Sequence, residues 1–300
     1  MGKTTGISWT RSTWNPWIGC TEVSPGCDNC YARALDARFR YGGATHWGAG
    51  VPRHRTSEAN WRAPLLWNKH AKEAGRRWTV FPSLCDPFDN EVPDEWRARF
   101  WELIHATPAL TWLLLTKRIG NVTRMLPSWW DDDYGNVRRH VWIGVSIVNQ
   151  EEANRDIPKL LAVPSAKRFV SYEPALGPID FRPFFTEHRT IYFPAGTQGD
   201  LSGREIADIY YNGIDHIIVG GESSQGGVKA RPFNLFWARS VISQCKAAGV
   251  PVFFKQAGSR PGWWEEGNIK ILASFKDRAG ADPSEWPEEF QVQQFPEGRP

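Results

Sequence analysis

The chain has 300 residues, 41% of them hydrophobic, with a net charge of +3 and a pI near 8.6. This length can bury one large core, and so mild a positive charge permits an anionic partner without requiring nucleic acid. The sequence shows no secretory signal and no apolar run near the ~20 residues that span a bilayer, and its five cysteines fit a reducing compartment better than a disulfide framework. We therefore expect a cytoplasmic protein without a membrane partner.

A unit recurs along the chain: a short apolar run, a polar cluster at its C-terminal end, and then a helical pattern. The runs are predicted as strands at 13–18, 78–81, 111–116, 140–145, 168–172, 216–219 and 251–254. Helices are predicted near 29–40, from 93 onward, up to about 126, near 150–161 and over about 234–248. Apolar strands alternating with helices indicate a parallel sheet buried on both faces. We predict an α/β fold, a partial or complete parallel (β/α) barrel of about six to seven strands.

The domain organisation follows from where this pattern is interrupted. Glycine-rich residues 41–70, predicted as irregular with one short helix, and the stretch 177–212 are predicted as insertions in a single barrel-like domain that covers 1–258. The tail 259–300 is rich in Gly, Pro, Trp and Glu, and we expect it to pack on the barrel.

Three of the five cysteines lie within eleven residues, in the loop after the first predicted strand. Cys20, Cys27 and Cys30 have the spacing C-x6-C-x2-C, and the loop ends in the first turn of a predicted helix. Helix N-terminal N–H groups favour thiolate, so we expect lowered thiol pKa values here. A structural zinc site takes four ligands, whereas three cysteines on a [4Fe-4S] cluster leave one iron open for a small molecule such as S-adenosylmethionine. Zinc completed by a distant His or a water, and a disulfide beside a free thiol, are the alternatives.

Polar residues follow each of the later strands, at the end of a barrel where reactive groups gather. For cofactor binding we predict Ser83, Asp86, Thr116, Lys117, Ser146 and Asn149. For catalysis we predict Glu173, Glu222 and Lys255. An ammonium group needs acceptors such as a carboxylate, a ribose needs hydroxyl or amide partners, and a carboxylate in a half-dry pocket needs an opposing cation.

A basic, aromatic segment comes after the cysteine loop. It contains Arg33, Arg38, Arg40, Tyr41, His54, Arg55 and Trp61. Aromatic and arginine side chains together are typical of nucleotide and nucleic-acid binding. An ordinary solvated helix face is the alternative.

Several short sequence motifs together indicate a family resemblance. They are Ser8-Trp9-Thr10, the run 13–17 with the cysteine loop, Gly144-Val145-Ser146, the run 173–178, Gly220-Gly221-Glu222-Ser223 and Phe253-Phe254-Lys255-Gln256. Over residues 7–258 the chain resembles the phage and mobile-element three-cysteine-motif family, which is distantly similar to radical S-adenosylmethionine enzymes. The resemblance implies a partial barrel, a [4Fe-4S] cluster on Cys20, Cys27 and Cys30, radical chemistry and, for a phage-encoded protein, the host-cell cytoplasm. It departs from the wider enzyme group, whose spacing is C-x3-C-x2-C and whose Gly-Gly-Glu follows the second strand rather than the sixth.

Two functional hypotheses follow. The first is an iron–sulfur enzyme that cleaves S-adenosylmethionine and abstracts hydrogen from a substrate, with a nucleobase or nucleic acid as a candidate. The second is a zinc-stabilised module that binds nucleic acid or a partner protein without redox activity.

Overall fold

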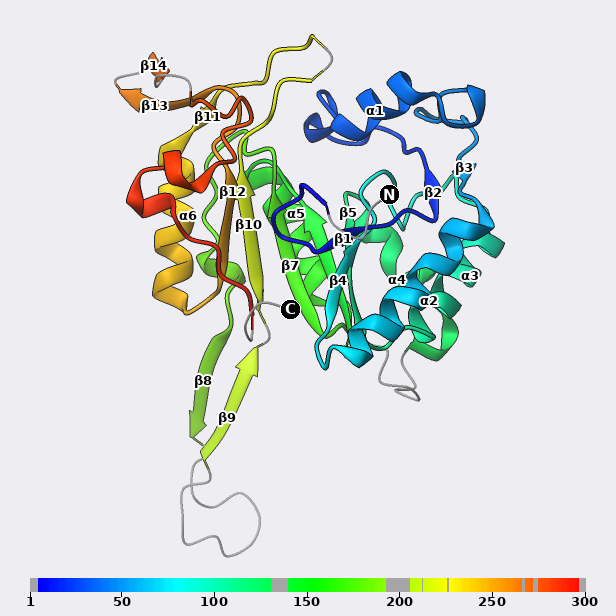
Figure 1. Ribbon diagram of the computed structural model, residues 1–300. Helices are drawn as coiled ribbons and strands as arrows, with labels where there is room; N and C mark the ends of the chain where they lie inside the picture. Colours follow the sequence, from blue (N-terminus) through cyan, green and yellow to red (C-terminus); the bar gives the residue numbers. More distant parts are fainter. Residues whose placement is uncertain are drawn as a thin grey trace, which may run out of the picture.

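The computed structural model describes residues 5–130, 140–192, 206–211, 213–225, 227–265, 268–271 and 275–296. Seven strands form one sheet in the order β1-β4-β5-β6-β7-β10-β12, and every neighbouring pair is parallel. The strands are β1 (Ser12–Thr13), β4 (Trp78–Phe81), β5 (Leu110–Thr116), β6 (Val141–Ser146), β7 (Lys167–Tyr172), β10 (His216–Gly220) and β12 (Val252–Gln256). The sheet is curled into a half-barrel flanked by helices (Figure 1). The predicted fold class is confirmed.

Both faces of the sheet are buried, which is why its strands are almost continuously apolar. Successive residues of β5 point to opposite faces: Leu114 belongs to the large core between sheet and helices, and Leu113 to a smaller cluster with Phe169 and Phe253. Most of the tryptophans have core positions; Trp14 and Trp112, for example, are fully buried in the large core.

The helices are α1 (Tyr31–Phe39), α2 (Glu58–Glu73), α3 (Asp94–His105), α4 (Val122–Met125), α5 (Gln150–Leu161) and α6 (Leu235–Ala248). All but α2 lie where the sequence predicts a helix. The 16-residue α2 is longer than the short helix predicted within the insertion 41–70, and it continues to Glu73. Side chains cap three of them: Ser57 accepts from Asn60 N, Asn149 from Glu152 N, and Asn234 from Phe236 N. None of the described helices has the length and apolar content that a membrane span requires.

The first predicted strand, 13–18, is wrong in one respect, because the chain leaves the sheet half-way. β1 ends at Thr13, and β2 (Trp17–Ile18) pairs antiparallel with β3 (His54–Arg55) instead. Pro16 has no N–H to donate to a ladder, and the Asn15 side chain accepts a 2.6 Å hydrogen bond from Leu84 N. The cysteine loop therefore follows β2, beside the sheet rather than in line with it.

Shorter elements fill the predicted insertions and the tail. Residues 41–70 contain η2 (Tyr41–Gly43) and β3, and 177–212 contain η6 (Arg182–Phe184) and the antiparallel pair β8 (Glu187–Tyr192) and β9 (Ile206–Tyr211); 193–205 and 212 lie outside the described residues. The small sheet β11 (Phe233–Asn234), β13 (Pro261–Glu265) and β14 (Asn268–Ile271) and the turns η7 (Pro283–Glu285) and η8 (Glu288–Phe290) belong to the C-terminal part. Phe254 of β12 donates its N–H to Val292 O at 2.8 Å, and its ring packs against Trp286 and Phe290.

Candidate functional site

The three cysteines of the loop line a single cavity of about 150 Å³. The cavity lies where β4, β5 and β6 end. Its other walls include a fourth thiol and several predicted cofactor-binding residues: Cys85, Ser83, Asp86, Thr116, Lys117 and Ser146. The structure thus brings together, at one end of the sheet, side chains that are up to 126 positions apart in the sequence.

Local sequence fixes the loop that carries the thiols. Ser24 Oγ accepts from Gly26 N at 3.0 Å, and Cys27 N donates to Ser24 O at 2.9 Å, which closes the turn η1 (Pro25–Cys27). Cys30 is the N-cap residue of α1, and its N–H donates to Cys27 O at 3.2 Å. A serine cap and a proline therefore hold Cys27 and Cys30 within one turn of each other.

The prediction of lowered thiol pKa values is wrong for Cys20 and Cys30. Burial raises the pKa of the Cys20 thiol to about 12. Burial also raises the pKa of Cys30, although backbone N–H groups of α1 act in the opposite direction. The helix terminus contributes as expected, but desolvation of a thiolate outweighs it. A bound cation would reverse this balance, since metal-bound thiols are deprotonated.

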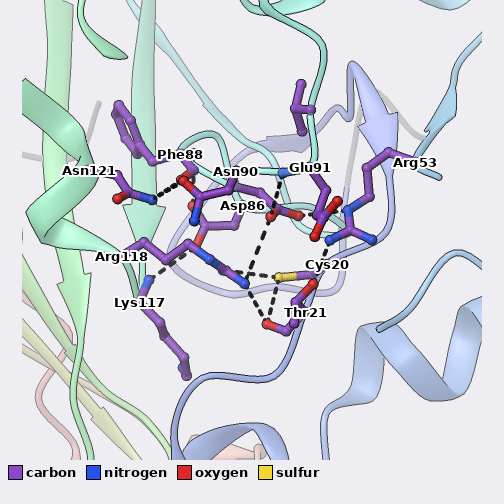
Figure 2. A network of polar contacts seen from close by, with 12 residues as sticks. Cys20, Thr21, Arg53, Asp86, Phe88, Asn90, Glu91, Lys117, Arg118 and Asn121 are labelled. Carbon is purple, nitrogen blue, oxygen red and sulfur yellow. Dashed lines mark hydrogen bonds and ion pairs between the residues drawn. The ribbon is translucent and has the colours of Figure 1, made fainter. Parts of the chain in front are cut away.

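Arg118, which also lines the cavity, contacts Cys20 (Figure 2). Its Nη1 lies 3.4 Å from Cys20 Sγ and donates to Asp86 Oδ2 at 2.9 Å, and its Nη2 donates to Thr21 O at 2.6 Å. The Arg118 and Asp86 side chains are only 7% and 9% exposed. A buried, charge-compensated guanidinium therefore faces the Cys20 sulfur.

Both oxygens of the Asp86 carboxylate accept hydrogen bonds from protein donors. The carboxylate accepts from Thr116 Oγ1 at 2.8 Å, from Phe88 N at 2.9 Å and from Lys117 N at 3.2 Å, in addition to Arg118. Asp86 and Thr116 line the cavity, yet their polar atoms face each other. Their predicted role in cofactor binding stays a prediction, and the structure adds a positioning role.

A second buried ion pair continues the network. Arg53 Nε donates to Asp89 Oδ2 at 2.7 Å, with both side chains almost inaccessible, and Arg53 Nη2 donates to Thr21 Oγ1 at 2.7 Å. Sequence reasoning missed Arg53 and Arg118 as site residues. The only signal was the position of Arg118 immediately after a strand end, and no spacing separates such a buried arginine from a solvated one.

A second, larger cavity of about 320 Å³ adjoins the first. The two share seven lining residues, among them Cys30, Lys117 and Ser146. The three predicted catalytic residues, Glu173, Glu222 and Lys255, all line this larger cavity. Its remaining walls include the aromatic rings of Trp9, Tyr31 and Phe81. Cys30 therefore lies where the thiol cavity adjoins a space lined by the predicted acid, base and aromatic groups.

Glu173 and Lys255 form an ion pair in this larger cavity. Lys255 Nζ lies 2.8 Å from Glu173 Oε1, and Ser171 Oγ donates to Glu173 Oε2 at 3.1 Å. Lys117 Nζ contacts Ser146 Oγ, and no carboxylate in the described part of the chain pairs with it. The arrangement offers one compensated pair that can hold or pass a proton, and one cation at the boundary of the two cavities that is ready for an anion.

A family model described as "Protein of unknown function (DUF5131)" matches residues 4–285, a span that includes every cavity-lining residue. The chain belongs to this family. No curated protein and no solved structure matches it. For this family member, functional inference therefore has to rest on the geometry of the two cavities.

Glu222, which follows β10, connects the cysteine loop to Arg231. Arg231 Nη2 donates to Glu222 Oε1 at 2.7 Å, and Asn29 Nδ2 donates to Glu222 Oε2 at 2.8 Å. Arg231 Nη1 also donates to Asp28 Oδ2 at 3.0 Å and to Pro25 O at 2.8 Å. Burial by itself would raise the pKa of Glu222, but the bonds from Arg231 and Asn29 outweigh it and lower the pKa. The predicted catalytic role of Glu222 stays a prediction; what its contacts form is a clamp on the loop.

Two other predicted cofactor residues lie in different surroundings. The Asn149 side chain accepts from Glu152 N at 2.9 Å as the cap of α5, and Asn149 lines neither cavity. Ser83 lines the thiol cavity, where Asn15 Nδ2 donates to its hydroxyl at 3.4 Å. A helix cap and a ribose ligand require the same residue types, which is why the sequence could not separate them.

Proposed function

We propose that this protein binds a [4Fe-4S] cluster through Cys20, Cys27 and Cys30 and acts as a radical S-adenosylmethionine enzyme. One observation carries the proposal: the three thiols line one cavity, and that cavity shares walls with a larger one lined by acid, base and aromatic side chains. A three-thiol site beside a small-molecule space is what a cluster with one open iron requires.

The side-chain geometry favours a cluster over a single ion. One zinc ion needs its ligands at about 2.0–2.3 Å from one point. Among the described His, Cys, Asp and Glu residues, no group of three converges in this way. Each cysteine of a cluster binds a different iron, so the sulfurs stand around a volume rather than around a point. A cavity of about 150 Å³ lined by three thiols fits that need.

Two cations suit the negative charge that thiolates bring. The Arg118 guanidinium is 3.4 Å from Cys20 Sγ, and Lys117 lines both cavities without a carboxylate partner among the described residues. Hydrogen bonds to ligating sulfur and nearby positive charge stabilise a reduced cluster. Arg118 would hold the Cys20 end of the site, and Lys117 would face both the cluster and its ligand.

The larger cavity suits the rest of S-adenosylmethionine. Its volume of about 320 Å³ can contain a nucleoside-sized group, and Phe81 and Trp9 offer apolar walls to an adenine. Lys117 can pair with the methionine carboxylate, and Ser146 can hydrogen-bond to it or to a ribose. The Glu173–Lys255 pair also lines this cavity and could exchange a proton with the substrate or with the cofactor's amino group.

A cluster held by Cys20, Cys27 and Cys30 would supply one-electron, radical-generating chemistry toward S-adenosylmethionine, with the electron coming from an external reductant. The chain's own groups would position the reactants and exclude water. The buried Arg118–Asp86 pair would keep the Cys20 sulfur in place throughout.

Anaerobic reconstitution with iron and sulfide tests the cluster. We expect about four irons per chain and a broad absorbance near about 400 nm. Alanine at Cys20, Cys27 or Cys30 should abolish both, whereas Cys245→Ala, a buried thiol on α6, should leave both intact. Stoichiometric zinc without iron would contradict the proposal.

Cys85 provides a second, sharper test, because its thiol lines the same cavity. In a three-cysteine site, Cys85→Ala retains the iron, and addition of S-adenosylmethionine perturbs the electron paramagnetic resonance spectrum of the reduced cluster. Loss of the cluster in Cys85→Ala would make it the fourth ligand and close the open iron. Formation of 5′-deoxyadenosine under reducing conditions then tests the reaction itself.

A further inference from the structure

An exposed patch at the C-terminal end of α1 has no role in the cavities. We call it the α1 patch; it consists of Arg38, Phe39, Arg40 and Tyr41. The Phe39 ring is 55% exposed although it is large and apolar. The Arg38 guanidinium lies 5.2 Å from the Phe39 ring centroid, and the Phe39 and Tyr41 centroids are 5.9 Å apart. Two adjacent rings and a guanidinium stacked on one of them form a surface suited to planar ligands.

The α1 patch lies in an arginine-rich segment. Residues 29–55 contain five arginines and one aspartate, but Arg33, Arg53 and Arg55 pair with Glu22, Asp89 and Glu58. That aspartate, Asp36, is buried and accepts from the His46 N–H and ring, so it offers no charge to the surface. Within the described residues, neither Arg38 nor Arg40 forms an ion pair. Their charges are therefore available to an external anion.

Arg40 also keeps an unusual backbone conformation. Its φ of 45° and ψ of 59° are left-handed, and it is the one non-glycine residue with positive φ in the described part of the chain. A helix ends more easily in this conformation with glycine. The chain has an arginine here although two glycines follow at 42 and 43, so helix termination alone does not account for the residue.

The α1 patch lies on the same helix that borders both cavities. α1 begins at Tyr31, which lines both of them, and ends at Phe39. Eight residues at 1.5 Å each separate the two rings by about 12 Å, the length of three to four stacked nucleotides. Figure 1 shows α1 above the end of the sheet where the strands finish.

We propose that the α1 patch binds single-stranded nucleic acid, with bases stacked on Phe39 and Tyr41, phosphates on Arg38 and Arg40, and the strand directed toward the larger cavity. The binding face itself rests on the contacts and charges described above. That one nucleotide of the strand enters the larger cavity as the substrate rests, in addition, on the proposed function. Single strands suit the patch because their bases are free to stack, whereas a duplex hides them.

Fluorescence anisotropy with labelled oligo(dT) and oligo(U) of about 15 nucleotides tests the binding face. We expect Phe39→Ala to weaken binding at least about fivefold. Arg38→Gln and Arg40→Gln should each lower the slope of log K against log salt by about 1, because each removes one phosphate contact. A preference for one oligonucleotide would identify DNA or RNA as the natural ligand.

Two control variants match these changes elsewhere on the surface. Phe236→Ala removes a ring on α6 that is 40% exposed, and Lys69→Gln removes a charge on α2 whose side chain is 72% exposed. Neither control should change affinity by more than the error. Absence of salt-dependent binding, equal losses in the control variants, or equally tight binding of a blunt duplex would overturn the proposal.

The same titration with Cys20→Ala separates this proposal from the proposed function. The α1 patch contains no thiol, so a protein that binds no iron should bind the oligonucleotide unchanged. Loss of oligonucleotide binding in the patch variants together with normal iron content shows that the two sites are independent. Oligonucleotide binding without any iron site would retain the nucleic-acid face and reject the enzyme.

Discussion

The two ends of the cysteine loop are held in contrasting ways. At the Cys20 end, the ion pairs Arg118–Asp86 and Arg53–Asp89 have side chains that are no more than 9% exposed. At the Cys27–Cys30 end, Arg231 is 27% exposed and its partner Asp28 is 64% exposed. Both ends use an arginine that is distant in sequence. Arg231 also pairs with Glu222, whose side chain is only 8% exposed, so the contrast lies in the greater exposure of Arg231 itself and of Asp28.

The difference teaches where the site is rigid and where it can adjust. A buried pair resists separation, because breaking it leaves an uncompensated charge in a dry place, whereas an exposed pair is screened and contributes little. We therefore expect the Cys20 end of the loop to be held more rigidly than the segment with Cys27 and Cys30. Four changes break or sharpen this contrast, in order of decreasing effect.

The largest effect is expected from two matched glycine substitutions. Gly19 has φ +118°, and a Cβ there would lie 2.3 Å from the His46 carbonyl oxygen, so Gly19→Ala should lower the free energy of unfolding by more than about 4 kcal/mol. At Gly26 φ is not positive, and a Cβ would meet the flexible Lys117 side chain and the buried Val148 side chain, but no backbone atom nearer than these. We expect a smaller loss there, about 1–3 kcal/mol. Urea unfolding of both variants measures the difference, and similar losses would remove the contrast between the two ends.

Arg118→Gln should lower the free energy of unfolding by about 3–5 kcal/mol, because Asp86 would be left buried without its cation. Asp86→Asn, which keeps the Thr116 hydrogen bond but not the charge, should cost less. Chemical denaturation checks both. A loss below about 1 kcal/mol for Arg118→Gln would mean that water reaches the pair.

Arg231→Gln should cost less than Arg118→Gln, about 2 kcal/mol: Glu222 is buried and would lose its cation, but Arg231 and Asp28 are partly exposed and Asn29 still donates to Glu222. The effect is local: hydrogen exchange should accelerate in residues 22–30 and not around Cys20. Arg239→Gln, which breaks the exposed pair with Glu289 on another surface, is the matched control and should leave that segment unchanged.

Lowering the pH should weaken the Glu222–Arg231 clamp, and of the four changes this one should alter the free energy of unfolding least. The folded pKa of Glu222 lies below its ordinary value of 4.5, so between these values the unfolded chain binds more protons. The contribution of Glu222 is complete above about pH 4.5 and is lost as the pH falls through the folded pKa. The difference in unfolding free energy between wild type and Glu222→Gln, about 1 kcal/mol at neutral pH, should shrink on acidification. A difference that stays constant would contradict the role of the carboxylate charge.

Much of the fold could be predicted from the sequence. Strands such as β5 and β6 are buried on both faces and therefore read as continuous apolar runs, and helices such as α5 begin at a capping residue and have apolar periodicity. The break between β1 and β2 was missed because Pro16 and the Asn15 side chain redirect the chain through contacts with Leu84, a distant residue. Local pattern contains no information about such a partner.

The position of the candidate site could be predicted from the sequence, but the pairing of its charged side chains could not. The spacing of Cys20, Cys27 and Cys30 and the rule that polar groups gather at strand ends were enough to place the thiols beside Lys117 and Glu173. The same rule could not tell that Asp86 is saturated by Arg118 and Thr116, or that Asn149 is a helix cap.

By itself, the sequence determined the seven-strand α/β frame and the thiol-bearing loop, because apolar period, helix caps and residue spacing act over a few neighbouring residues. Only the tertiary structure decided which charges are engaged, since Arg118 reaches Thr21 across 97 positions and Arg231 reaches Asp28 across 203. Whether a carboxylate faces a ligand or a guanidinium depends on burial and on which distant cation folds against it, and both are properties of the packed chain.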